Sequence, residues 1–496
     1  MNHRPRIQSL ALIFMLLLFL SACSLSEPTA QPPVPIREVS DIPPAVNSPG
    51  SDSLGDSLYA GFGNGGYDVQ HYTLDLTITD VEAGEMDGIV TINARAVQDL
   101  DAFNLDFIGY EISAVTVDSN PADFTRADQE LTIIPARPIS SGTAFTVGIS
   151  YSGTPERLES QAAVGRVGWI PLDDGSLVLS EPDGAATYYP VNDHPLDKAA
   201  YTFQITVPSD YEVVANGVLS DTSDNGDSVT YVWQATDPMA SYLTTVNIGD
   251  YDLETDESDS GVPIRNYFAA TLDDDAREPF ARQAEMIDYF SEIFGPYPFE
   301  VYGSIVIDAE VGTALEAQTL SLYGIDQLDL DDIDSAEQLV AHELAHQWFG
   351  DSISVADWGD IWLNEGFATY SEGLWIEYTQ GAEARDEWVM DNYEYVADYL
   401  QDEAPPGIPA ADNLFSERIY CQGALTLHAL RLQVGDDTFF KIIQTYFDRY
   451  QGGNARTADF IAVAEEISGQ DLTEFFDSWL YADTIPAIPE LDLSSD

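Results

Sequence analysis

Two histidines and a glutamate have the spacing that a zinc site on a helix requires. His342 and His346 are four residues apart, and Glu343 directly follows the first of them. Residues at i and i+4 share one face of an α-helix, so both imidazoles can bind one Zn²⁺. Glu343 lies beside them, close enough to take a proton from water at the metal without being a ligand. The pattern therefore predicts a hydrolytic zinc site.

A catalytic zinc also needs a third protein ligand and one open position. Glu365, within an Asn-Glu-Gly run, lies 19 positions after His346, a distance that suits a second helix packed against the first. Two histidines and one glutamate form the ligand set of many hydrolytic zinc sites. We predict one Zn²⁺ per chain, held by His342, His346 and Glu365, with Glu343 as the catalytic base.

The alternative is a chance motif, because a histidine on an apolar helix face is often a core residue. The chain has only six histidines, and His3, His71 and His194 are far from the motif in sequence. Two of the six fall at ligand spacing around a glutamate, with a further glutamate downstream. We therefore favour a zinc hydrolase over a structural role for these residues.

The composition indicates a large, very acidic globular protein. At 496 residues the chain can form two to four domains. It has 86 acidic and 18 basic residues, a formal net charge of −68. Such a surface repels phosphate backbones, which argues against nucleic-acid binding. The acidic residues are spread along the whole chain, which is typical of a solvated surface suited to salty surroundings.

The N-terminus has the pattern of a bacterial lipoprotein signal. Arg4 and Arg6 precede an apolar run over residues 7–20, which is short for a membrane span. Small residues then precede Cys23, an arrangement that resembles the lipobox at which a lipoprotein is cleaved and lipidated. We expect a signal peptide over 1–22 and a lipid anchor on Cys23 at the outer face of a membrane in the bacterial envelope. An ordinary secretory signal is the alternative. If Cys23 is lipidated, Cys421 is the one cysteine left and has no partner for an internal disulfide.

The rest of the chain divides by composition and periodicity. A proline-rich flexible linker is expected over 23–62, and alternating apolar runs predict an antiparallel β-sandwich over 63–258. A mostly helical zinc domain is expected over 259–490, before an acidic tail over 491–496. The fold class is therefore α+β and multidomain. Helices beyond Glu365 are expected over 366–379, 383–400, 420–433, 437–450 and 457–468.

With both zinc segments in hand, the chain resembles the aminopeptidase N family of gluzincin metallopeptidases. The run from His342 to Gly350, and the run Trp-Leu-Asn-Glu-Gly-Phe-Ala around Glu365, are close to that family's signature. The resemblance covers residues 66–490 and implies a thermolysin-like catalytic domain after the sandwich. It also implies a short form of the family without the long C-terminal helical domain, and so a less enclosed substrate groove.

The resemblance implies two carboxylates that bind the free amine of a peptide substrate. Glu316 matches the glutamate of the family's Gly-Ala-Met-Glu-Asn segment, although Leu315 and Ala317 replace its methionine and asparagine. Glu181, before Pro182, has the place of a second amine-binding residue. A carboxylate near zinc can pair with an ammonium group and reject substrates without one. The alternatives are an exposed residue at Glu316 and a simple turn residue at Glu181.

The resemblance also implies a phenol that stabilises the oxyanion. Tyr420 matches the family's tyrosine ahead of a Lys-Gly pair, although Gln422 replaces the lysine before Gly423. A phenol near the scissile carbonyl would help zinc to hold developing negative charge. The alternative is that Tyr420 only packs near a helix N-terminus, and we expect a structural role for His428.

These features together predict a zinc aminopeptidase that removes N-terminal residues from peptides with a free N-terminus. One rival is a zinc endopeptidase on the same fold, which Ala317 and the missing C-terminal domain favour. A hydrolase for an epoxide or another small substrate is less favoured. A tethered peptide-binding lipoprotein with a vestigial site would have lost a ligand or Glu343, and none is lost here.

Overall fold

The first half of the chain folds into strands that bury alternate side chains. The computed structural model describes residues 50–156, 158, 160, 162 and 166–494. Strand β11 (Ala199–Pro208) buries every second residue, as a sheet with one face on the core requires. The predicted period-two pattern is therefore present in the strands themselves.

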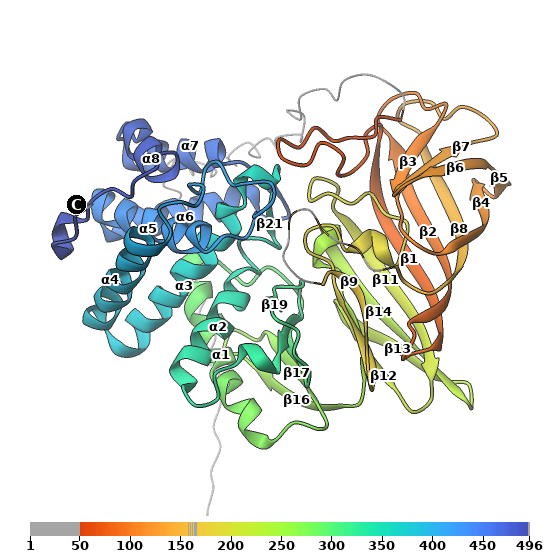
Figure 1. Ribbon diagram of the computed structural model, residues 1–496, viewed down its shortest axis with the longest axis horizontal. Helices are drawn as coiled ribbons and strands as arrows, with labels where there is room; N and C mark the ends of the chain where they lie inside the picture. Colours follow the sequence, from red (N-terminus) through yellow and green to blue (C-terminus); the bar gives the residue numbers. More distant parts are fainter. Residues whose placement is uncertain (1–49, 157, 159, 161, 163–165, 495–496) are drawn as a thin grey trace, which may run out of the picture. The chain divides into compact units, whose positions relative to one another are not determined.

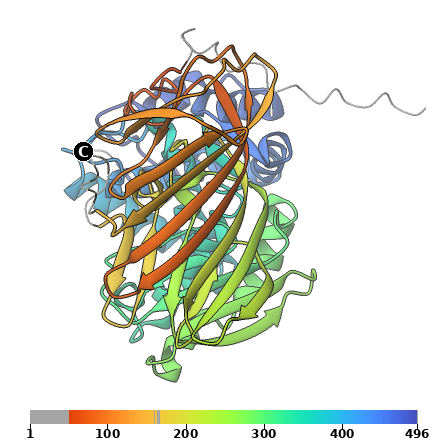
Figure 2. The ribbon, with the colours of Figure 1, turned by 90° about the vertical axis from the view of Figure 1, so that its right-hand side faces the viewer.

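Eight strands form the largest sheet, in the order β13-β14-β11-β1-β2-β8-β4-β5, and Figure 2 shows its broad face. Neighbouring strands are antiparallel except β1 and β11, which pair in parallel. The prediction of a wholly antiparallel sandwich is corrected at this pair. The other strands of this sheet are β1 (Tyr67–Asp80), β2 (Glu85–Ala96), β4 (Glu111–Val117), β5 (Asn120–Pro121), β8 (Ala144–Gly153), β13 (Val218–Asp224) and β14 (Ser228–Met239).

Two smaller sheets share the hydrophobic core of the large one. Their orders are β12-β15-β10-β9 and β3-β7-β6. The strands are β3 (Phe103–Asp106), β6 (Asp123–Ala127), β7 (Glu130–Ile134), β9 (Gly168–Leu172), β10 (Gly175–Leu179), β12 (Glu212–Ala215) and β15 (Val246–Gly249). Strand β10 leads into the turn that carries Glu181, a predicted site residue.

The second half begins with a five-stranded sheet in the order β16-β17-β18-β20-β19. Its strands are β16 (Tyr251–Glu257), β17 (Pro263–Ala269), β18 (Tyr302–Ile307), β19 (Ala314–Leu315) and β20 (Ser321–Gly324). The inner strands β17, β18 and β20 run parallel, while β19 is an antiparallel edge strand. Glu316 follows this edge strand directly.

Helices make up most of the remaining chain, as predicted (Figure 1). They are α1 (Gln283–Phe294), α2 (Ile333–Ala345), α3 (Trp362–Gln380), α4 (Ala382–Tyr399), α5 (Glu417–Val434), α6 (Asp436–Tyr450), α7 (Thr457–Ser468) and α8 (Thr473–Leu480). Helices α3 and α5 begin earlier than expected. The order of a sheet-rich part before a helical part confirms the predicted fold class.

Residues 50–66, here called the N-terminal strap, join the two halves. The Asp56 carboxylate accepts a hydrogen bond from the Trp358 backbone N–H at 2.8 Å and lies 3.2 Å from His194 Nε2. Tyr59 and Phe62 are buried. Residues 50–62, which the prediction placed in the flexible linker over 23–62, are instead held by buried aromatic side chains and by the hydrogen bonds of Asp56. The rest of that predicted linker lies outside the described residues.

Two predictions concern membranes. The signal peptide and the lipidation site at Cys23 lie outside the described residues. Within the described ranges, no helix combines the length and the apolar character needed to cross a bilayer.

Candidate active site and metal centre

The end of α2 and the start of α3 bring the three predicted metal ligands together. His342 lies in the last turn of α2, His346 caps that helix, and Glu365 lies in the first turn of α3. All three are buried. The two histidine Nε2 atoms are 3.1 Å apart, and Glu365 Oε2 lies 3.6 Å from His342 Nε2 and 3.5 Å from His346 Nε2.

The two distances to Glu365 fit a zinc ion, and the distance between the histidine nitrogens is slightly shorter than the ideal one. Ligand atoms about 2.0–2.2 Å from a tetrahedral ion lie about 3.3–3.6 Å from one another. Each histidine turns its other nitrogen to an acceptor: His342 Nδ1 to Glu372 Oε1 at 2.8 Å and His346 Nδ1 to the Phe349 carbonyl at 3.1 Å. With protons on Nδ1, both Nε2 lone pairs face each other, an arrangement that a bound cation would stabilise.

The electrostatics of Glu365 agree with a ligand role. Burial acts to raise the pKa of this carboxyl, but the charge of His346 and hydrogen bonds from His342 and His346, when these imidazoles are protonated, hold it at about 2. Glu365 therefore remains a carboxylate over the whole physiological pH range. A deprotonated oxygen is what a metal ion requires from this side chain.

Glu343 lies beside the predicted ligands, and one of its carboxylate oxygens is within 4.8 Å of ligand atoms of Glu316 and His346. Its carboxylate is buried, and Oε2 has no hydrogen-bond partner within the described residues. Burial raises the pKa of Glu343 to about 7, although His342 and His346 pull it down. A carboxyl with a pKa near neutrality can both accept and return a proton at physiological pH.

Two further carboxylates, Glu181 and Glu316, lie beside the metal ligands as the resemblance implied. Glu181, Glu316 and Glu365 each place one oxygen within 4.8 Å of the other two. Glu181 Oε1 and Glu316 Oε1 are both buried without a hydrogen-bond partner in the described chain. Burial raises the pKa of Glu316, and burial together with the charge of Glu316 raises the pKa of Glu181.

Gln347 fixes the position of Glu316 against the zinc helix. Its amide donates to the Glu316 carbonyl at 3.1 Å and accepts from the Thr319 backbone N–H at 2.8 Å. The residue that follows the two histidines therefore holds the edge-strand segment in place. Sequence reasoning gave Gln347 no role, since a contact between α2 and β19 is not encoded in local spacing.

Tyr420 lies over the same site. Its ring is stacked 6.0 Å from that of His342. Burial, and next the charges of Glu365 and Glu181, raise the pKa of Tyr420 well above its usual value, so the phenol keeps its proton and can donate. The structure thus brings together every site residue that the sequence predicted within the described range.

Two glycines allow this approach of α5 to α3. A Cβ on Gly366 would lie 2.9 Å from the Gly423 backbone, and one on Gly423 would lie 2.8 Å from Gly366 Cα. Gly366 is next to Glu365, and Gly423 is one turn after Tyr420. The close crossing therefore sets how near the phenol comes to the metal ligands.

The two departures from the family pattern differ in their surroundings. Gln422 is fully buried; its oxygen accepts from Arg418 Nε at 2.8 Å and its amide donates to the Trp479 carbonyl at 2.6 Å. It therefore supports the packing of α5 on α8. Ala317 is also fully buried, and its methyl group offers no polar contact to a substrate.

Glu372 is a site residue that the sequence analysis missed. It lies seven residues after Glu365 on α3, and two helical turns place both carboxylates on one face. That spacing was visible in the sequence, but many glutamates in so acidic a chain have similar spacings. Only the packing of α3 on α2 distinguishes Glu372, through its hydrogen bond to His342.

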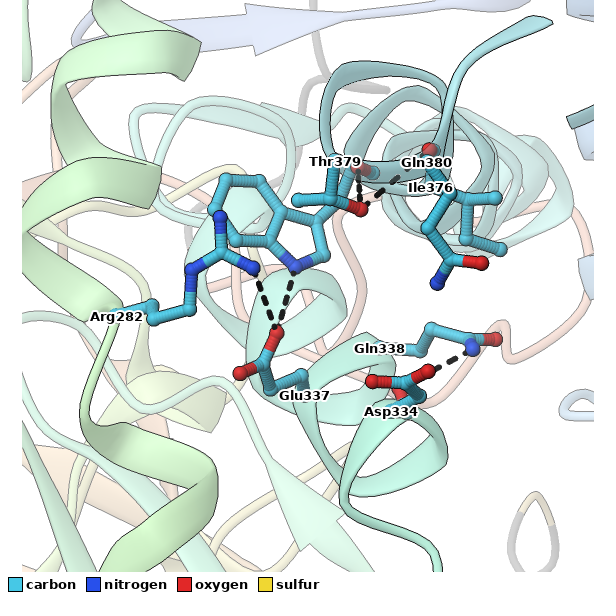
Figure 3. Close-up of a pocket in the computed structure, with 8 residues that line it drawn as sticks. Arg282, Asp334, Glu337, Gln338, Ile376, Thr379 and Gln380 are labelled. Atoms are coloured by element: carbon cyan, nitrogen blue, oxygen red, sulfur yellow. Dashed lines mark hydrogen bonds and ion pairs between the residues drawn. The ribbon is translucent and has the colours of Figure 1, made fainter. Parts of the chain in front are cut away.

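A separate polar pocket of about 240 Å³ lies between the first turns of α2 and the last turns of α3 (Figure 3). Glu337 there accepts from the Trp375 indole at 3.3 Å and pairs with Arg282 at 3.4 Å. None of the site residues named above lines this pocket. Its contacts support the outer ends of the two helices that carry the metal ligands.

Comparisons with known proteins agree on the family. The profile described as Peptidase M1 N-terminal domain matches residues 68–243, and that described as Peptidase family M1 domain matches residues 279–479. The crystal structure of an M1 zinc metallopeptidase from Deinococcus radiodurans is 31% identical, with a TM-score of 0.81. The alignment covers 88% of this chain and 98% of that one.

Curated relatives are longer than this chain. Aminopeptidase N of Streptomyces lividans is 27% identical over 463 residues, which cover 86% of this chain and 52% of the relative. Glutamyl aminopeptidase of Bos taurus is 30% identical over 321 residues, or 60% of this chain and 33% of the relative. The chain thus spans about half the length of the Streptomyces protein and about a third of the bovine one. The two profile matches lie in both halves of the fold, and a two-domain M1 zinc metallopeptidase structure aligns along 99% of its length. Together with the cluster of His342, His346 and Glu365, these matches show that the chain belongs to peptidase family M1.

Proposed function

We propose that this M1 family member is a zinc-dependent aminopeptidase. The observation that carries the proposal is the position of Glu181 and Glu316, whose unpartnered buried oxygens lie beside the metal ligands. Buried carboxylate oxygens without a partner are costly, and a substrate ammonium group would supply the missing donor and charge. An ammonium held there brings only the first peptide bond of a substrate to the metal.

The chain's own residues then divide the reaction between them. A zinc ion held by His342, His346 and Glu365 would act as a Lewis acid toward the carbonyl group and water. Glu343 accepts the proton of the attacking water and delivers it to the leaving amine. The Tyr420 phenol donates a hydrogen bond to the carbonyl oxygen as negative charge develops there.

The relatives support this activity without fixing the preferred residue. The Streptomyces protein is named aminopeptidase N, and the bovine one glutamyl aminopeptidase. A mutant of the Deinococcus enzyme was solved with a Tyr-Ser-Ala substrate, and two-domain M1 mutants were solved with L-tryptophan and with L-arginine. These names indicate exopeptidases with different side-chain preferences.

An endopeptidase is the second candidate, because Ala317 offers no side-chain amide beside Glu316. A tripeptide and its N-acetylated form separate the two functions. An aminopeptidase cleaves only the free form, whereas an endopeptidase that needs no ammonium group cleaves both. Equal cleavage of the two peptides would refute the proposed exopeptidase.

A variant pair tests whether Glu316 holds the amine. We expect Glu316→Gln to lower kcat/KM for the free peptide by about 10- to 100-fold, because a charge-assisted hydrogen bond is lost. Glu383→Gln, an exposed change in the first turn of α4, is the matched control and should have no effect. Unchanged kinetics in Glu316→Gln would remove this residue from amine binding.

We further propose that Cys23 is lipidated and anchors the enzyme on the extracytoplasmic side of a bacterial membrane. The support is the signal-like sequence before this cysteine. In a bacterial host, wild-type protein should sediment with membranes and Cys23→Ala should not. A wild-type protein that is soluble and unmodified at Cys23 would contradict the anchor.

A further inference from the structure

A buried tyrosine from the first half of the fold contacts the segments that carry the metal ligands. Tyr242 lies in the short turn η2 (Ser241–Leu243), inside the range that the N-terminal family profile matches. Its side chain is fully buried, and its ring packs edge to face on the ring of Trp358, with centroids 5.3 Å apart. Trp358 lies shortly before the start of α3. Tyr242 therefore joins the sandwich to the metal-binding half close to that helix.

The hydroxyl of Tyr242 makes two hydrogen bonds, one to each segment that carries a metal ligand. It donates to the Gly350 carbonyl at 3.0 Å and accepts from Asn364 Nδ2 at 3.2 Å. Gly350 follows soon after His346, and Asn364 directly precedes Glu365. A single group from the sandwich therefore fixes the distance between the segment after α2 and the start of α3.

The Gly350 end of this link lies against one of the ligands. A Cβ on Gly350 would be 3.1 Å from His346 Nδ1, so the backbone here is close to the imidazole. Gly350 also follows Phe349, whose carbonyl lies 3.1 Å from the same nitrogen. Ser354 Oγ donates to the Gly350 carbonyl as well. This carbonyl therefore keeps one partner if the hydroxyl of Tyr242 is lost.

The Asn364 end of the link lies at the start of α3. Asn364 is buried, and its backbone N–H donates to the Ile361 carbonyl at 2.9 Å. Its side-chain amide donates to the phenol oxygen of Tyr242. A buried amide that loses its acceptor is costly. Loss of the hydroxyl would therefore favour a shift of the first turn of α3, and Glu365 would move with that turn.

Resting on the zinc site of the proposed function, we propose that Tyr242 is a positioning residue for the metal centre. Its hydroxyl holds His346 and Glu365 at the separation that a bound ion requires, and it acts on them through Gly350 and Asn364. Ligands that are held in place by surrounding hydrogen bonds bind a metal more tightly than ligands that must be ordered on binding. The sandwich therefore contributes to metal affinity as well as to amine binding.

The variant Tyr242→Phe tests this role, because it removes the hydroxyl and keeps the ring. We expect its zinc affinity, measured by competition with a chelator in the absence of substrate, to fall about tenfold. Tyr67→Phe is the matched control, since it removes another buried hydroxyl of the sandwich, which donates to the Asn104 carbonyl at 2.6 Å. Both variants should lose thermal stability, but Tyr67→Phe should bind zinc as tightly as wild type.

Cobalt gives a second measurement that a merely structural role would not change. The visible spectrum of bound Co²⁺ depends on the geometry of its ligands. Tyr242→Phe should therefore alter the bands of the cobalt-loaded protein, whereas Tyr67→Phe should leave them as in wild type. A wild-type spectrum in Tyr242→Phe would contradict a change in ligand geometry and refute the proposal.

The kinetics of the zinc-saturated enzyme should show a larger effect on kcat than on KM. Asn216 Nδ2 donates to the Leu243 and Gln318 carbonyls at 2.9 and 2.8 Å. These bonds remain in Tyr242→Phe and hold the segment after Glu316, so binding of the substrate amine should change little. Displaced metal ligands instead reduce the rate of the bound substrate. An effect on KM alone, with wild-type zinc affinity, would place Tyr242 in substrate binding and refute the proposal.

The remaining outcomes separate this proposal from the proposed function. Zinc affinity of Tyr242→Phe within about threefold of wild type would refute the positioning role and leave the aminopeptidase intact. A clear loss of zinc affinity in a protein that hydrolyses no amide would support the positioning role and refute the aminopeptidase. If Tyr242→Phe does not fold, Asn364→Leu breaks the same hydrogen bond from the α3 side. Wild-type zinc affinity in Asn364→Leu would then refute the role.

Discussion

At the scale of single residues, His342 is held from both sides by carboxylates. Its Nε2 faces Glu365 at 3.6 Å, and its Nδ1 hydrogen bonds Glu372 at 2.8 Å. The outer bond selects the tautomer in which Nε2 is free for a metal. His346 Nδ1 instead hydrogen bonds the neutral Phe349 carbonyl. The two predicted ligands therefore differ in the charge of the group that accepts the Nδ1 hydrogen bond.

This asymmetry gives a prediction for Glu372. We expect Glu372→Ala to weaken zinc affinity about 10- to 100-fold, because outer partners of metal-binding histidines have effects of that size. Glu372→Gln keeps an acceptor without the charge and should fall in between. Competition with a chelator measures the affinity directly, and zinc affinity equal to wild type in Glu372→Ala would contradict the positioning role.

The pKa of Glu343 gives a prediction for pH dependence. Burial raises this pKa to about 7, and a base works only after it has lost its proton. Activity should therefore fall as pH falls through a value at or below about 7, since a bound cation favours the ionised form. A profile of kcat/KM from pH 4.5 to 8.5 measures this; activity that rises toward pH 5 would exclude Glu343 as base.

At the scale of elements, the site depends on how closely α5 can approach α3. The backbones of Gly366 and Gly423 are in contact. Gly366 is next to Glu365, and Gly423 is one turn after Tyr420. The sequence predicts both helices from their apolar periodicity. It does not predict their crossing, because helix packing is a contact between distant segments with many possible registers.

Gly423→Ala tests the crossing. The added methyl would lie 2.8 Å from Gly366 Cα, and such overpacking costs about 1–3 kcal/mol of stability. We expect a lower unfolding temperature together with a reduced kcat, because Tyr420 moves relative to His342. The exposed change Gly452→Ala would strain only a loop. Wild-type kcat and stability in Gly423→Ala would show that the crossing has room to spare.

The same contrast between local and distant information runs through the rest of the molecule. The metal ligands and Glu343 could be read from spacing along one or two helices. Glu316, Glu181 and Tyr420 needed a family resemblance, because they come from different elements. The parallel pairing of β1 with β11 and the bond from Glu372 to His342 could not be predicted, since both join segments far apart in sequence.

At the scale of the whole molecule, a net charge of −68 acts against the folded state. Like charges spread over a compact surface repel one another, and dissolved salt screens that repulsion. The N-terminal strap and the contacts of Lys198 and Tyr242 with residues 350–352 hold the two halves against it. Stability should therefore depend on ionic strength.

We predict that raising NaCl from 0.05 to 2 M increases the unfolding temperature by on the order of 5 °C or more. The reason is that salt weakens the repulsion between surface carboxylates, and each weakened repulsion adds up to several tenths of a kcal/mol to the free energy of unfolding. Calorimetry in parallel sucrose solutions separates screening from general exclusion of cosolutes. An unfolding temperature that stays constant or falls with salt would show that surface repulsion does not limit stability.

The proposed aminopeptidase activity depends on one zinc ion held by His342, His346 and Glu365. Titration of metal-free folded protein with Zn²⁺ while a Leu amide is hydrolysed tests it most directly. Activity should rise to a plateau at one zinc per chain and stay near zero for His346→Ala. A metal-free protein that is fully active, or a folded protein that binds no zinc, would contradict the claim.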